Sequence, residues 1–190
     1  MMKMNDILII GAGPAGASAA IFAAKAGKKT VVIDNDKSLT KRAWVENHYG
    51  VTEISGPNLI EIGKEQAKKF GAEFITASVS NLKNIENGFQ VETDEQENYE
   101  AKHIIFASGV SLSVAEAFGI HTTKGTEPRI NTILDVDIDG KTNIPGIWAA
   151  GTCAGVSVHT IITAGDGAKV AINIISELNG ERYVDHDLLK

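Results

Sequence analysis

Three glycines, Gly11, Gly13 and Gly16, form a G-x-G-x-x-G sequence that constrains the fold of this chain more than any other feature. Residues 6–10, before them, are apolar after Asp6 and predict a buried strand, and residues 14–26, which include Gly16, are rich in alanine and predict a helix. In such a turn the second glycine lets the backbone approach a pyrophosphate, and the helix N-terminus offers free N–H groups and a positive dipole end. The spacing therefore predicts a dinucleotide-binding βαβ unit.

The second strand of this unit is expected at residues 30–33, and Asp34 follows it about 20 residues after the glycines. An acidic side chain there can accept hydrogen bonds from both ribose hydroxyls of an adenosine and would repel a 2′-phosphate. Asp36 lies close by and could share or take this role, and a solvated carboxylate at a strand end is the alternative interpretation. NAD and FAD both carry this adenosine, so the unit alone does not choose between them.

The remaining apolar pattern predicts an α/β fold: a Rossmann-like domain with a parallel sheet, a crossover antiparallel β-meander and helices. A second amphipathic helix is expected at residues 57–70, and a closing helix at about 160–178. Strands are expected at 73–79, 81–85, 89–93, 99–101, 103–107 and 147–150. A length of 190 residues requires no more than one domain, so residues 1–190 are expected to form one.

The composition argues against several classes of partner and location. The net charge of −6 comes with scattered lysines and arginines, which argues against a nucleic-acid partner. The single cysteine, Cys153, excludes an internal disulfide and fits a reducing compartment, so a cytoplasmic location is expected. No cluster has metal-ligand spacing, so no metal is expected. Glycines and prolines interrupt the apolar runs, so neither a secretory signal nor a membrane span is expected.

The segment GAGPAG at residues 11–16 resembles the FAD domain of thioredoxin reductases, in the pyridine nucleotide-disulfide oxidoreductase family. The likeness covers nearly the whole chain, because it continues in VENHYG at 45–50, GPNLIEIGKEQAKKFGAEF at 56–74, IPGIWAAGT at 144–152 and HTIITAGDGAKVA at 159–171. The resemblance implies an FAD-binding domain and favours FAD over NAD.

The resemblance also implies a set of FAD-binding residues that runs from the pyrophosphate loop to the flavin ring: Gly11, Gly13, Pro14, Ala15, Asp34, Asn35, Arg42, Asn47, Val79, Ser108, Gly109, Gly151, Thr152, His159 and Thr160. The backbone of Val79 would meet the adenine edge. The helix that begins at His159 and Thr160 would present N–H donors to the N1 and C2-carbonyl edge of the ring, where reduction can place negative charge. His48, Tyr49 and His159 are the candidate catalytic residues.

Three departures from the family pattern bear on function. The chain has no C-x-x-C, so dithiol–disulfide exchange through an internal pair is excluded. It has no second glycine fingerprint, and only about residues 110–129 stand where relatives carry an NADPH-binding domain. Thr152 replaces the usual aspartate, which weakens one expected contact but leaves a hydroxyl that can make it.

The leading hypothesis is an FAD-dependent oxidoreductase that passes electrons through its flavin to an unknown small-molecule or protein acceptor. The donor would be NADH or NADPH, bound transiently, or a partner protein. A partner-dependent FAD-binding subunit or sensor is the main alternative, and an NAD-binding Rossmann protein without flavin is a third. Because a missing nicotinamide domain would leave one ring face open, a homodimer is expected.

Several residues invite a functional reading but favour a structural one. Cys153 lies beside the expected flavin site, yet a small buried residue is favoured over a redox role because no resolving cysteine exists. Trp44 and Trp148 are expected in the core or at a dimer contact. The histidines outside any motif, namely His103, His121 and His186, are expected at the surface or at strand ends.

Overall fold

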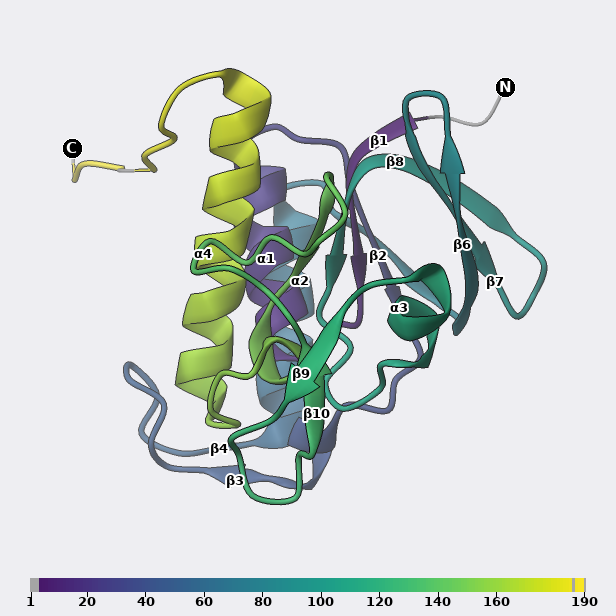
Figure 1. The fold of residues 1–190 in the computed structure, drawn as a ribbon. Coiled ribbons are helices and arrows are strands. Elements are labelled where there is room, and N and C mark those ends of the chain that lie inside the picture. The colour runs from purple at the N-terminus through teal and green to yellow at the C-terminus, as the bar shows by residue number, and fades with distance from the viewer. Residues whose placement is uncertain (1–3, 186, 190) are drawn as a thin grey trace.

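The computed structural model describes residues 4–185 and 187–189, which form three layers around one central sheet (Figure 1). Three long helices cover one face of the sheet: α1 (Pro14–Lys25), α2 (Gly56–Lys69) and α4 (Thr160–Asn179). The short helix α3 (Ser113–Phe118) and the antiparallel pair β9 (Thr122–Lys124) and β10 (Thr132–Leu134) lie on the opposite side. The predicted α/β class is confirmed.

The parallel part of the sheet begins with the predicted βαβ unit. Its strands are β1 (Met4–Ile10), β2 (Thr30–Asp34), β5 (Glu73–Thr76), β8 (Asn98–Phe106) and β11 (Ile147–Ala149). The spatial order is β5-β2-β1-β8, and β11 pairs with β8. β2 and β5 therefore lie on one side of β1, and β8 and β11 lie on the other. The carboxyl ends of all five strands point to the same edge, with the reversal of order between β1 and β8.

Side chains of successive strand residues fill two separate cores. Ile7, Ile9 and Ile105 face α1 and α4, and Leu8 and Phe106 face α3 and the meander. Because both faces are covered, the parallel strands are apolar throughout rather than alternating. This burial explains why residues 6–10 and 30–33 can be recognised as strands from composition alone.

The antiparallel meander consists of β6 (Val79–Ile85), β7 (Gly88–Thr93) and the first half of β8. The prediction of two separate strands at 99–101 and 103–107 was wrong. One continuous strand changes partner along one edge, because β7 pairs at Ala101 and β11 pairs from Ile104 onward. The prediction of a single strand at 73–79 was also wrong. β5 ends at Thr76, and Ala77 and Ser78 separate it from β6.

Several short elements had no clear sequence signal. The 3-10 turn η1 (Leu39–Arg42) and the pair β3 (Trp44–Val45) and β4 (Ile54–Ser55) organise the segment after β2, and the 3-10 turn η2 (Gly151–Ala154) precedes α4. Two-residue strands and single turns carry too few residues for a periodic pattern to emerge.

His103 is a further correction, because it is only 8% exposed rather than at the surface. Trp148, which is fully buried as expected, donates from Nε1 to Nδ1 of His103 at 3.2 Å. Burial lowers the pKa of His103, in keeping with a ring nitrogen that accepts this bond. His121 is exposed as predicted, whereas Trp44 is exposed and so does not belong to the core. His186 lies outside the described residues.

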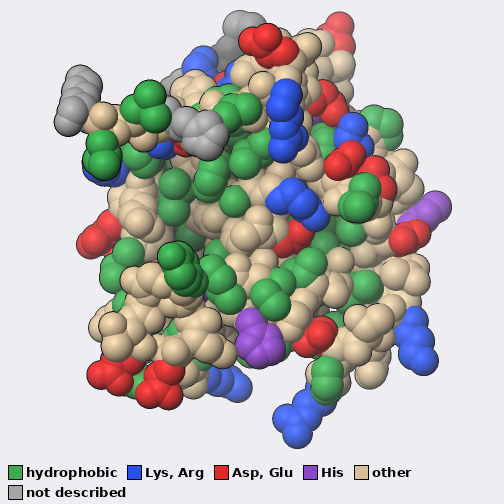
Figure 2. All heavy atoms as spheres, turned by 90° about the vertical axis from the view of Figure 1, so that its left-hand side faces the viewer, with side chains coloured by type: hydrophobic (Ala, Val, Ile, Leu, Met, Phe, Trp, Pro, Cys, Tyr) green, Lys and Arg blue, Asp and Glu red, His purple; other side chains and the backbone are tan. Residues whose placement is uncertain are grey.

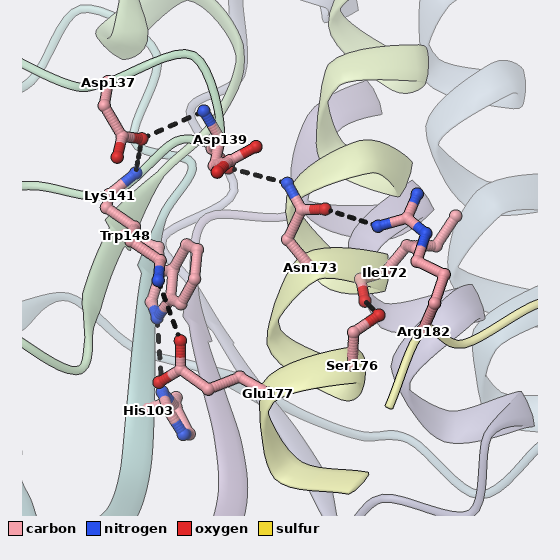
Figure 3. Close-up of polar contacts among 10 residues, drawn as sticks. All are labelled: His103, Asp137, Asp139, Lys141, Trp148, Ile172, Asn173, Ser176, Glu177 and Arg182. Carbon is pink, nitrogen blue, oxygen red and sulfur yellow. Dashed lines mark hydrogen bonds and ion pairs between the residues drawn. The ribbon is translucent and has the colours of Figure 1, made fainter. Parts of the chain in front are cut away.

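Polar contacts hold the C-terminal half of α4 to the segment that leads into β11 (Figure 3). Glu177 of α4 pairs with Lys141 at 3.0 Å, and Asn173 donates to the carbonyl of Asp139 at 3.0 Å. Arg182, just beyond the helix, donates to the Asn173 side chain at 2.9 Å. α4 is therefore fixed at the end far from the carboxyl edge of the sheet.

Within residues 4–185 and 187–189, no helix combines the length and apolar character needed to cross a membrane. The same described residues contain no group of three or more His, Cys, Asp or Glu side chains placed to hold a metal ion.

The contact between α1 and α4 yields a stability prediction. A Cβ added at Gly167 would overlap the carbonyl of Ala15 on α1, and no side-chain rotation can relieve a clash with backbone. We expect Gly167→Ala to lower the free energy of unfolding by about 1–3 kcal/mol, measured by urea denaturation. The matched control is Gly165→Ala on the same helix, where a Cβ meets open space. That variant should be neutral or stabilising by up to about 1 kcal/mol. Equal effects of the two substitutions would contradict the packing argument.

Candidate functional site

A cavity of about 700 Å³ lies at the carboxyl edge of the parallel strands, where the strand order reverses between β1 and β8. Ligands bind at this position in open α/β sheets, and the volume falls within the range of cofactor sites. Its walls come from five places in the sequence: the glycine loop, the segment after β2, the residues that join β5 to β6, the loop after β8, and the stretch from η2 to the N-terminal turn of α4. The topology therefore brings distant segments to one site.

The glycine loop forms the floor of one end of the cavity. Gly11 adopts φ +101°, and a Cβ there would overlap the carbonyl of Ala107, so glycine is required. α1 begins at Pro14 with Gly13 as its N-cap, and no side chain of the described residues caps it. No acidic residue lies in the first turn. The N–H groups of this turn remain free to bind an anion.

Asp34 lies at the adjacent wall and is only 7% exposed. One of its carboxylate oxygens, Oδ1, accepts a hydrogen bond from the Ala12 amide at 3.1 Å. The other, Oδ2, accepts from Lys64 Nζ at 3.0 Å. Each oxygen can accept more than one bond, so the carboxylate keeps acceptor capacity toward the cavity.

The opposite end of the cavity is formed by η2 and α4. Thr152, Thr160 and Thr163 line it, and α4 begins at Thr160 with His159 as N-cap and no side-chain cap from any described residue. Gly151 has φ +80°, and its amide donates to Asp166 at 2.8 Å. The Gly151 amide therefore already has a partner within the protein.

The two helix N-termini are offset along the cavity. α4 contacts Ala15 of α1 at Gly167, and it begins at Thr160, seven residues earlier (167 − 160). At about 1.5 Å per residue, the start of α4 lies about 10 Å beyond the level of Ala15. The cavity thus offers two separate donor sites for negative charge, one at each helix N-terminus.

Most of the predicted cofactor-binding residues line this cavity: Gly11, Gly13, Pro14, Ala15, Asp34, Asn35, Val79, Ser108, Gly109, Thr152 and Thr160. Residues outside the lining are Arg42, Asn47, Gly151 and His159, together with the candidate catalytic residues His48 and Tyr49. Tyr49 is 93% exposed. The His48 ring contacts a lining residue, because its Nδ1 is 2.9 Å from Oγ1 of Thr160. The His159 ring instead lies 2.8 Å from the Ser157 hydroxyl.

Sequence reasoning missed a group of polar and small residues that also line the cavity: Lys37, Ser38, Thr40, Ala77, Ser78, Ser111 and Thr163. Ala77 and Ser78 were hidden because the predicted strand ran through them. The run from Lys37 to Thr40 directly follows Asp34 and Asn35, and its serine and threonine content was the available signal for a loop that approaches a ligand.

Cys153 lies beneath this end of the cavity but does not line it. It is buried, and its Sγ donates to the carbonyls of Phe106 at 3.1 Å and Ala150 at 3.3 Å. Burial raises the pKa of the thiol to about 11. A thiolate is therefore disfavoured, and the prediction of a packing residue is confirmed.

Comparison with known proteins agrees with the architecture. The model of the family "Pyridine nucleotide-disulphide oxidoreductase" matches residues 5–127 and 43–168. The thioredoxin reductase of Aquifex aeolicus is 42% identical over 111 residues, which cover 56% of this chain and 34% of that protein. The thioredoxin reductase of Peptoclostridium acidaminophilum is 36% identical over 141 residues, which cover 72% and 44%. The chain thus spans less than half the length of these curated relatives.

Solved structures share the fold at lower identity. A thioredoxin reductase from Gloeobacter violaceus superposes with a TM-score of 0.78 at 19% identity, with 100% of both chains covered. An oxidoreductase from Agrobacterium tumefaciens superposes with a TM-score of 0.81 at 15% identity, covering 94% of this chain and 100% of the other. These likenesses establish the Rossmann-like fold.

The buried thiol leads to a pH prediction. Because the pKa of Cys153 rises from 9.0 to about 11 on folding, the folded state holds this proton more tightly than the unfolded state. The resulting stability is complete below pH 9 and is lost as pH rises toward 11. We expect the unfolding free energy of the wild type to fall by about 2–3 kcal/mol more than that of Cys153→Ala across this range. Ellman's reagent should react slowly with the folded protein at pH 8. Parallel pH profiles of the two proteins would contradict the burial argument.

Proposed function

This chain belongs to the pyridine nucleotide-disulphide oxidoreductase family, and we propose that it binds FAD in the cavity at the carboxyl edge of the sheet and acts as an FAD-dependent oxidoreductase. The observation that carries the proposal is the pair of helix N-termini, free of described side-chain caps, that open onto one cavity. Among common dinucleotides, FAD has a pyrophosphate in its middle and, at one end, a ring that can take up negative charge.

The residues present fit such a group. The start of α1 offers the backbone N–H groups of Gly13 and Ala15 to the pyrophosphate, beside Pro14, and Asp34 offers a carboxylate to the adenosine ribose. Thr160 and the amides at the start of α4 would stabilise negative charge on the N1 and C2-carbonyl edge of the ring. When bound, FAD would supply the hydride and electron chemistry, while the protein orients the ring and excludes water.

The single cysteine and the short connection between β8 and β11 bear on the electron donor and the electron acceptor. The only cysteine is buried with its thiol proton retained, so electrons would leave to a small molecule or a protein rather than through an internal dithiol. The connection from β8 to β11 holds only α3, β9 and β10 among its helices and strands. We therefore propose a single FAD-binding domain in which NADH or NADPH binds transiently, or a partner protein supplies electrons. A cytoplasmic location stays a prediction.

The short β8–β11 connection also motivates the second candidate, a partner-dependent FAD-binding subunit or sensor. In that case the cavity would hold FAD, but no nicotinamide donor would reach the ring without another protein. The two candidates predict the same cofactor and differ in whether this chain alone can be reduced.

The test of the proposed function begins with the cofactor. The purified protein should be yellow, and its heat-denatured supernatant should contain FAD. Anaerobic mixing with NADH or NADPH should bleach the flavin band within seconds to minutes. Bleaching supports the oxidoreductase, whereas FAD that neither donor reduces would favour the partner-dependent subunit. A colourless protein that neither releases nor takes up FAD would contradict the proposal.

Gly13→Val provides the matched variant for this test. Gly13 has φ −66° and ψ −175°, which valine can adopt, and its Cβ would lie 3.1 Å from the Ser38 hydroxyl on the cavity wall. We expect the variant to fold but to retain at least about tenfold less FAD, because the backbone of the second glycine must approach the pyrophosphate. Gly165→Ala, which lies in open space on α4, should keep full FAD content.

We also propose a homodimer formed by the segments around the start of α4. Ile161 and Ile162, in the first turn of α4, are exposed. Trp44 and Tyr49 are also exposed, and they lie on the segment that contacts the start of α4 through the bond between His48 and Thr160. Figure 2 shows hydrophobic side chains at the surface on the side of the molecule that α4 covers. A partner there would lie beside the ring end of the cavity.

Sedimentation velocity of the FAD-loaded protein tests the dimer. The wild type should sediment as a dimer, and Ile162→Glu should weaken association at least about tenfold because it places a charge in an apolar contact. Ile62→Glu on α2 is the matched control, since Ile62 and Ile162 are both 45% exposed. A monomeric wild type at micromolar concentration, or equal effects of the two substitutions, would contradict the proposal.

A further inference from the structure

Lys64 reaches the nucleotide end of the cavity from α2 and contacts Asp34 there. α2 lies close against α1, because a Cβ added at Gly63 would come within 3.1 Å of the Ala17 side chain. This close approach brings the neighbouring Lys64 to the carboxyl end of β2. Its ammonium group lies 3.0 Å from Oδ2 of Asp34, and the two side chains are only 15% and 10% exposed. The pair is thus largely shielded from solvent and salt.

Asp34 and Lys64 stand in different relations to the cavity. Asp34 lines it, whereas Lys64 does not. The Asp34 carboxylate is held at two points, by the Ala12 amide on Oδ1 and by Lys64 on Oδ2. Two fixed oxygens leave the carboxylate plane little freedom to rotate. Its remaining acceptor sites toward the cavity are consequently held in one orientation.

The neighbouring acid, Asp36, is engaged elsewhere. It forms an ion pair with Lys41 and does not line the cavity. Its nearer oxygen lies 3.9 Å from Lys64 Nζ, so Lys64 stands close to both acids. The sequence left both Asp34 and Asp36 as candidates to bind the ribose. Of the two, only Asp34 lines the cavity. The positive charge of Lys64 reduces the repulsion between the negative charges of Asp34 and Asp36.

We infer that Lys64 is a positioning residue for recognition of the adenosine ribose: it acts through Asp34, whose carboxylate it orients toward the 2′- and 3′-hydroxyls. This inference rests on the proposed nucleotide site. It assigns to α2, which contributes no lining residue to the cavity, a role in selecting a ribose with a free 2′-hydroxyl.

The expected effect follows from the geometry. Without Lys64, Oδ2 loses its partner, the carboxylate can rotate, and the nearby charge of Asp36 is less balanced. A hydrogen bond to a charged acceptor contributes enough that a mispositioned one lowers affinity by about tenfold. The loss should be specific to ligands that carry the 2′-hydroxyl.

The experiment titrates ADP and 2′-deoxy-ADP into the full chain after removal of flavin, by calorimetry. The wild type should bind ADP about tenfold more tightly than 2′-deoxy-ADP. Lys64→Met should bind ADP about tenfold more weakly and discriminate less than about threefold, and Lys64→Arg should restore both properties. Asp34→Asn should also lose discrimination. Lys69→Met, which removes the same charge from the same helix, should behave as the wild type.

The ratio of the two affinities is measured within each protein, so it does not depend on the folded fraction. If Lys64→Met does not fold, Lys64→Gln takes its place in the same measurement. Discrimination unchanged in Lys64→Met, or in Lys64→Gln where that variant replaces it, would overturn the role of Lys64, and so would a wild type that releases FAD on denaturation but does not distinguish the two ligands. A wild type that binds neither FAD nor ADP would overturn the proposed nucleotide site and this inference together.

Discussion

The close approach of α4 to α1 at Gly167 is the contact on which the cavity depends. The carbonyl of Ala15 occupies the space that a side chain at Gly167 would need. The methyl group of Ala15 likewise occupies the space that a side chain at Gly151 would need. Both contacts depend on a glycine, Gly167 in α4 and Gly151 in η2, because neither has a Cβ. They fix where α4 begins relative to the glycine loop, and so they set the offset of about 10 Å between the two helix N-termini. A thicker interface would move the two donor sites further apart than the pyrophosphate and the ring edge of the proposed FAD.

The C-terminal half of α4 packs through buried side chains, Val170, Ala171 and Ile174, and polar contacts add a second restraint there. The buried bond from Trp148 to His103 ties β11 to β8, and the contacts of Asn173 and Glu177 tie α4 to the turn before β11 (Figure 3). The exposed pair Lys141–Glu177 contributes little by itself. Burial lowers the pKa of His103, so the neutral ring that Trp148 requires is the favoured form. The helix is thereby held at both ends, and its N-terminus is not free to swing relative to the cavity.

Much of this arrangement could be predicted from the sequence, because the βαβ unit and the glycine loop are local features. Asp34, which follows the predicted second strand, lines the cavity, and so does Thr160, which the family resemblance pointed to. Gly151 does not line the cavity, and its amide donates to Asp166, a pairing that no spacing rule indicates. His103 was assigned to the surface because periodicity cannot show that Trp148 lies opposite it. The continuous strand β8 likewise appeared as two, because its change of partner depends on β7 and β11, which are distant in the chain.

The two ends of the cavity share one construction. Asp34 accepts the Ala12 amide and pairs with Lys64, and Asp166 accepts the Gly151 amide and pairs with Lys169. In each case a carboxylate of low exposure fixes a loop amide, and a lysine outside the cavity lining balances the carboxylate. The pairs are not equivalent, because the Lys169 side chain is 45% exposed and Lys64 only 15%, so the pairing at the nucleotide end is the less screened. Besides Lys37, which lines the cavity, backbone N–H groups at the two helix starts can attract a bound anion. Such donors have fixed positions, which suits the proposed FAD, whose pyrophosphate and ring edge would lie at a set separation.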